Sequence, residues 1–136
     1  MSSIATIALS GMNAATRRLE VSASNVANSA STGALPRADG TVPAGAPQAY
    51  APLKVVQTAT AGGGTQTTVT TVTPATVAVS DPKAPFANEG GLVAAPNVDL
   101  SGEMIGQMVA RYSFAANATM LKASDRVMKA LLDLKV

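Results

Sequence analysis

The sequence contains no cysteine and no histidine. Disulfide bridges are therefore excluded, as are the Ser-His-Asp and Cys-His sets that activate nucleophiles and the commonest zinc ligands. The longest glycine run, Gly62-Gly63-Gly64, lacks the Lys and Ser/Thr that complete a phosphate-binding loop. The acidic residues are scattered and show no spacing typical of paired catalytic carboxylates. We therefore expect no enzyme, and no cofactor, metal or small-molecule site.

Charged residues are few, at 13% of the chain, and leave a net charge of +2. So small an excess does not favour a nucleic-acid or acidic-substrate partner. The chain also lacks a run of about 18 apolar residues, which a transmembrane helix needs. The first cation is Arg17, so Met1–Ala5 has no basic region of the kind that begins a cleaved secretory signal. Any export is expected to use a route without signal cleavage.

Aromatic residues make up only 3% of the chain, and tryptophan is absent. Ala, Val and Thr supply most of the apolar surface instead. Alanine buries little area, and a chain of this size already buries a lower fraction of its surface than a large one. We therefore expect a thin core, with much of the stabilising contact coming from other chains.

Residues 1–32 predict a helix followed by a turn. Small and apolar residues alternate at steps of three and four, which is the pattern of a heptad seam. They are Ala5, Ala8, Met12, Ala15, Leu19, Ser22 and Val26. Periodicity alone leaves two interpretations open: a helix packed on its own domain, or a helix that packs against another chain.

Residues 33–98 are rich in Gly, Pro, Ala and Thr and begin as a loop, with a turn at Asp39-Gly40. Two β-prone runs, 53–58 and 65–72, flank Gly62-Gly63-Gly64, which can supply the positive φ of a hairpin loop. Val77–Val79 is a candidate third strand. The sequence favours an ordered hairpin here, and a flexible linker is the alternative.

Residues 99–136 predict one long helix with Asp99 or Ser101 as its N-cap. About 35 helical residues would extend roughly 50 Å. Apolar residues recur at steps close to 3.6 and form one stripe along this helix. The stripe consists of Ile105, Val109, Tyr112, Ala116, Met120, Ala123, Val127, Leu131 and Leu134. Its expected partners are the N-terminal helix and other copies of the chain.

The three segments together predict a mainly α fold. The N-terminal helix and the long C-terminal helix are expected to pair as an antiparallel coiled coil. The loop-rich middle segment, with its small β-hairpin, would then close the far end.

Several motifs resemble those of the flagellar basal-body rod and hook proteins. Asn25-Val26-Ala27-Asn28 is similar to the Asn-x-Ala-Asn segment that ends the first helix in that family, and Ser10-Gly11-Met12 is similar to a family pattern upstream. In the C-terminal half, Ala87–Val93 and Pro96–Asp99 resemble the proximal-rod type. The resemblance covers about 30 residues at the start and about 55 at the end.

The resemblance implies a structural subunit of the bacterial flagellar rod, in the periplasm, exported by the flagellar type III apparatus without signal cleavage. It also implies that the terminal helices line a hollow helical tube that transmits torque, beside related rod subunits and copies of the chain. Asn25 and Asn28 would be turn and capping residues or would bond directly between subunits; both roles stay open. The expected assembly interface consists of Met12, Leu19, Asn25, Val26, Asn28, Ile105, Val109, Tyr112, Met120, Val127 and Leu131.

Two alternatives remain at this stage. One is a different axial structural protein, such as a neighbouring rod or hook subunit. The other is a small secreted adhesin or effector, which a Thr-rich β segment would also suit.

Overall fold

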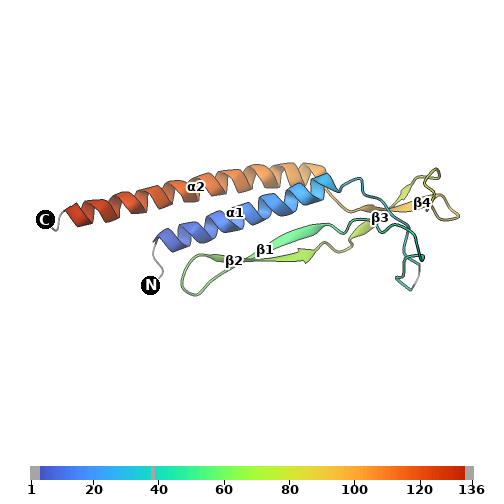
Figure 1. The fold of residues 1–136 in the computed structure, drawn as a ribbon, viewed down its shortest axis with the longest axis horizontal. Helices are drawn as coiled ribbons and strands as arrows, with labels where there is room; N and C mark the ends of the chain where they lie inside the picture. The colour runs from blue at the N-terminus through green and yellow to red at the C-terminus, as the bar shows by residue number, and fades with distance from the viewer. Residues whose placement is uncertain (1–3, 38, 134–136) are drawn as a thin grey trace.

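The protein is an elongated antiparallel helix pair with two small sheets (Figure 1). The computed structural model describes residues 4–37 and 39–133. Helix α1 spans Ile4–Ala27 and helix α2 spans Leu100–Asp133. Helix α1 lies between α2 on one side and the β1–β2 hairpin on the other, and the second sheet, β3–β4, lies beyond the far end of the helices (Figure 1).

The two helices approach closely because small residues line their contact. Ala8, Ala15 and Ala110 are each at most 2% exposed. A Cβ atom placed on Gly11 would lie 2.5 Å from Asn117 Oδ1, so glycine is what lets the helices come together at this level. The antiparallel pair that the sequence predicted is therefore present, while its coiled-coil character stays a prediction.

The predicted N-terminal seam is right at some positions only. Ala8, Ala15 and Ser22 are buried, as expected. Met12 and Leu19, however, are only half-buried. Between the seam positions, Ala14, Val21 and Asn25 are buried instead, because α1 has neighbours on two sides and its buried face is wider than one seam.

The predicted hairpin is confirmed. Strand β1 (Leu53–Ala59) pairs antiparallel with β2 (Thr65–Thr71), with Val55 opposite Val69. In the loop between them, Gly63 and Gly64 have φ values of 84° and 89°, which favour glycine. The hairpin is fixed to α1 at its tip, where the backbone N–H of Thr65 donates to Ser10 Oγ at 3.1 Å.

The expectation of a mainly α fold with one hairpin is wrong, because a second sheet makes the fold mixed α/β. Strand β3 (Thr76–Ser80) confirms the candidate third strand, and its antiparallel partner is β4 (Leu92–Pro96), which the sequence did not predict. The signal for β4 was hidden by Gly90-Gly91 and Pro96, which suggested loop. Pro96 stands at the last position of the strand, where proline is tolerated.

Gly33 connects the end of α1 to this second sheet. Its N–H and C=O both pair with Ala94, at 2.9 Å each. A Cβ atom at this position would lie 2.2 Å from the backbone nitrogen of Ala49, so no other residue fits without moving the main chain. Gly33 therefore ties the segment that follows α1 to β4.

The close contact between the helices predicts a change of sign in a double substitution. Gly11→Ala should destabilise the protein by about 1–2 kcal/mol, because the new methyl group meets the Asn117 side chain. In an Asn117→Ala background the same substitution should stabilise by up to about 1 kcal/mol, because alanine is the better helix former. Urea unfolding followed by circular dichroism measures both, and Gly11→Ala stabilising in both backgrounds would contradict the close contact.

Candidate assembly site

Asn25 is the most connected side chain at the junction of the helices and the hairpin. It is 1% exposed. Its Nδ2 donates to the carbonyl of Leu53 at 2.8 Å and to Glu103 Oε1 at 2.5 Å. Its Oδ1 accepts from the backbone N–H of Leu53 at 3.0 Å and from Tyr50 Oη at 3.1 Å. These four bonds use two donor and two acceptor positions, which is the full capacity of an asparagine side chain.

The bonds of Asn25 join three parts of the chain that are distant in sequence. They are the end of α1, the residues that lead into β1, and the first turn of α2. A second link runs beside it: Gln107 Nε2 donates to Ser22 Oγ at 3.1 Å. Asn25 is enclosed by its own chain, and its bonds hold these segments in place within the subunit.

Asn28 has a different role at the end of α1. Its Nδ2 donates to the carbonyl of Ser24 at 2.9 Å, and Ser29 Oγ donates to the carbonyl of Val26 at 2.9 Å. Both side-chain bonds add to backbone bonds at the same carbonyls, which already accept from the N–H groups of Asn28 at 3.1 Å and Ser29 at 3.3 Å. Asp99 caps the other helix, accepting from the backbone N–H of Ser101 at 3.0 Å, as the sequence predicted.

Two partners of Asn25 were missed in the sequence. The sequence patterns single out neither Glu103 nor Tyr50. A usable signal was present: both are large polar residues beside segments of small or apolar ones, and buried polar side chains need partners. Sequence spacing could not show which polar residue pairs with which.

The predicted apolar stripe of α2 does not face α1. The face that packs against α1 carries smaller and more polar residues, namely Glu103, Gln107, Ala110, Ser113 and Asn117. The described stripe residues are centred about a third of a turn away and are largely exposed. Leu134 lies outside the described residues. Their exposed fractions are 58% for Ile105, 48% for Val109, 77% for Tyr112, 53% for Met120, 59% for Val127 and 58% for Leu131.

The expectation that α1 covers this stripe is therefore wrong. The other expected partner, a further subunit, stays a prediction. Along α2, which spans 34 residues, Ala110 alone among the described residues is classed as buried.

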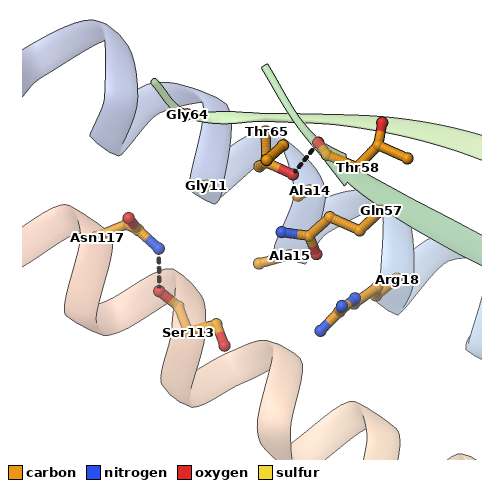
Figure 2. Close-up of a pocket in the computed structure, with 11 residues that line it drawn as sticks. Gly11, Ala14, Ala15, Arg18, Gln57, Thr58, Gly64, Thr65, Ser113 and Asn117 are labelled. Atoms are coloured by element: carbon orange, nitrogen blue, oxygen red, sulfur yellow. Dashed lines mark hydrogen bonds between the residues drawn. The ribbon is translucent and has the colours of Figure 1, made fainter. Parts of the chain in front are cut away.

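A groove runs between α2 and β1, with α1 as its floor. It contains two adjoining hollows of about 480 Å³ and 350 Å³, and Arg18 lines both. In the larger one, Arg18 and Gln57 extend into the space between the elements, and Asn117 bonds back to Ser113 of its own helix (Figure 2). Val109 lines the smaller one, so the apolar stripe borders the groove.

The groove provides a surface for contact but few groups for catalysis or metal binding. Across residues 4–37 and 39–133, no three His, Cys, Asp or Glu side chains gather where they could hold a metal ion. Hydrogen bonds from Thr41 lower the pKa of Asp39, but this carboxylate sits on an exposed turn outside the groove. Within the described part of the chain, neither helix is long and apolar enough to cross a membrane.

Comparison with known proteins defines the class to which this arrangement belongs. The family model for flagella basal body rod proteins matches residues 6–34, the segment of α1 with its Asn25 and Asn28. A second model, described as flagellar basal body rod FlgEFG protein C-terminal, matches residues 89–134, which include β4 and α2. Both terminal segments are therefore those of a flagellar rod protein.

Relatives that match almost the whole chain identify the family within this class. The chain is 36% identical to the flagellar basal-body rod protein FlgC of Yersinia enterocolitica, over 94% of this chain and 92% of that one. It is 35% identical, with the same coverage, to the FlgC proteins of Escherichia coli O157:H7 and Salmonella typhimurium. The chain belongs to the FlgC family of flagellar basal-body rod proteins. It is a structural subunit of the rod, and the adhesin or effector alternative is not favoured.

The hydrogen bonds of Asn25 predict that a small substitution at this position strongly lowers the free energy of unfolding. Asn25→Asp replaces the Nδ2 donor with a charged acceptor that faces Glu103 and the Leu53 carbonyl. We expect a loss of about 3 kcal/mol or more in the free energy of unfolding, because buried groups lose partners and a buried charge is added. Urea unfolding at neutral pH measures the loss.

Two further variants give this experiment its controls. Asn28→Ala removes one capping bond and should cost only about 1 kcal/mol. Glu103→Gln, added to Asn25→Asp, removes the repulsion and supplies a donor, so at least about 1 kcal/mol should return. Equal costs for Asn25→Asp and Asn28→Ala, with no recovery in the double variant, would show that Asn25 does not hold the junction.

Proposed function

We propose that the apolar stripe of α2 is the surface by which the subunit packs against neighbouring rod subunits and copies of itself. The observation that supports this is the exposure of six large side chains in a row on one side of a 34-residue helix. Full burial of one such side chain is worth about 1.5–3 kcal/mol. Burying several of these side chains together gives more free energy than a weak, transient contact needs. A surface of this kind is typical of a permanent assembly.

The shape of the subunit suits a shaft. The stripe lies on one side of an elongated body, so a neighbour can cover it with a different surface of its own. Heterologous contacts whose rotation does not close on itself generate helical filaments. In this proposal the subunits form a hollow helical shaft that transmits torque, and the chain performs no catalysis.

The proposal places the subunit in the periplasmic part of the rod. The flagellar type III apparatus would export it without signal cleavage, as the resemblance of the N-terminal motifs implies. Apart from Asn25, the predicted interface residues of the N-terminal segment are half-buried; they are Met12, Leu19, Val26 and Asn28. They retain enough free surface to contribute to contacts between subunits.

Val127→Asp tests the stripe without disturbing the subunit. Val127 is 59% exposed, so the free energy of unfolding should change by no more than about 0.5 kcal/mol. In the rod the same charge would lie in a buried seam and cost several kcal/mol per contact, so rods should not form and cells should not swim. Motility and basal-body recovery measure this at matched expression.

The matched control is Lys122→Ala, on the side of α2 away from the stripe. Lys122 is exposed, and its loss should leave swimming intact. If cells with Val127→Asp swim and cells with Lys122→Ala do not, then the contact surface is the side of α2 that carries Lys122 and not the stripe.

Deletion of residues 2–20 tests the export proposal. The truncated chain should accumulate in the cytoplasm. A companion variant, Gly11→Leu, keeps the N-terminal segment but blocks the approach of α2, so it should leave the cytoplasm and yet fail to support swimming. Recovery of the truncated chain from the periplasm at the normal level would show that the N-terminal segment is not needed for export.

A further inference from the structure

The methionines of α2 are the groups of this chain most open to oxidation. Peroxide in proteins reacts mainly with sulfur, and the chain has no cysteine, so its six methionines hold all of its sulfur. Four of them lie on α2 and are 52–65% exposed: Met104, Met108, Met120 and Met128. Met12, on α1, is half-buried. The oxidisable sulfur of the free subunit is therefore gathered on the helix that carries the apolar stripe.

Met120 differs from the other three because it belongs to the stripe. Its stripe neighbours on either side, Ala116 and Ala123, are small. Met120 is therefore the one large stripe side chain between Tyr112 and Val127, which are 15 positions, or about 22 Å of helix, apart. A polar group at this position would divide the stripe into two separate apolar patches.

Oxidation by hydrogen peroxide makes a methionine polar and leaves its length almost unchanged. A lone pair of the Met120 Sδ attacks one peroxide oxygen, and the O–O bond breaks. The departing hydroxide takes the proton of the transferred hydroxyl group and leaves as water. Sulfur has then lost two electrons and gained one S–O bond, and the peroxide has been reduced. The resulting sulfoxide is polar where the thioether was apolar, and methionine sulfoxide reductases can reverse the change.

We infer that Met120 is a modification site that controls entry of the subunit into the rod. The inference rests on the proposed role of the stripe as the contact surface. In the free subunit Met120 is 53% exposed, so peroxide reaches it. The S–O group would have to enter an apolar seam without a hydrogen-bond partner, which is unfavourable, so the oxidised subunit is excluded. In the rod, the neighbour that covers the stripe protects Met120.

The exposed methionines outside the stripe provide an internal comparison. Met104 is 65% exposed and lies about a third of a turn from the centre of the stripe, on the side away from α1. Its oxidation leaves the stripe continuous. The two methionines therefore share a helix and a chemistry and differ in their position relative to the proposed contact surface.

Two matched substitutions test whether polarity at Met120 blocks assembly. Met120→Gln places a polar side chain of similar length there, as a lasting mimic of the sulfoxide. The circular dichroism spectrum of the free chain should stay unchanged, while the yield of basal bodies should fall at least about tenfold. Met104→Gln should leave the yield within about twofold of normal. Equal yields of basal bodies from the two variants would overturn the inference.

Peroxide footprinting separates failure of this inference from failure of the proposed function. Free chains and isolated basal bodies are treated with dilute hydrogen peroxide, and peptide mass spectrometry follows the gain of one oxygen atom at each methionine. Met120 should react about as fast as Met104 in the free chain and at least about tenfold more slowly in basal bodies than in the free chain.

The outcomes of the footprinting are distinct. Equal Met120 rates in the free chain and in basal bodies would show that no neighbour covers the stripe at this level, and the proposed function would fail together with the inference. Slow reaction of Met120 already in the free chain would overturn the modification site. Protection in basal bodies, together with a normal yield of basal bodies from Met120→Gln, would retain the covered stripe and overturn the modification site alone.

Discussion

The structure depends most on the hydrogen bonds of one buried amide. Asn25 binds the end of α1 to the start of β1 and to the first turn of α2, and its side chain has no unused donor or acceptor. The apolar core around it is thin: among the described residues, the buried apolar side chains are alanines, two valines and two prolines. With so little area to bury, hydrophobic packing alone cannot fix the angle between the helices and the hairpin. A saturated polar centre supplies that precision, because each misplacement would leave a buried group without a partner.

A consequence of this design is that the two sides of α2 have separate tasks. The side toward α1 is built from small and polar residues and holds the subunit together, with Gly11 and Asn117 in close contact. The other side is apolar and free. A helix that buried its apolar stripe internally would be more stable alone but would have little to offer a neighbour. The arrangement suits a subunit whose final stability comes from the assembly.

Sequence patterns predicted the parts of this structure that depend on local periodicity. Both helices, the β1–β2 hairpin with its glycine loop, the strand at Val77–Val79 and the N-cap at Asp99 are confirmed. The family was also identified from short motifs at the two ends. These features depend on residues close together in the chain, whose spacing carries the signal.

The parts that sequence could not supply depend on contacts across the chain. Strand β4 was missed because glycine and proline at its ends outweighed its short apolar run, and its pairing with β3 and Gly33 is non-local. The partner of the stripe was misassigned because periodicity shows that a face is apolar but not what covers it. The bonds of Asn25 to Tyr50 and Glu103 join residues 25 and 78 positions apart, which no spacing rule predicts.

The central claim is that the polar side of α2 closes the subunit and the apolar side joins it to its neighbours. A density map of isolated basal bodies, detailed enough to place side chains, tests it most directly. The account predicts another subunit in contact with the stripe from Ile105 to Leu131, and the hydrogen bond between Asn25 and Glu103 intact within each subunit. A map in which the stripe faces solvent, while the side with Gln107 and Asn117 has left α1 to contact another subunit, would contradict it.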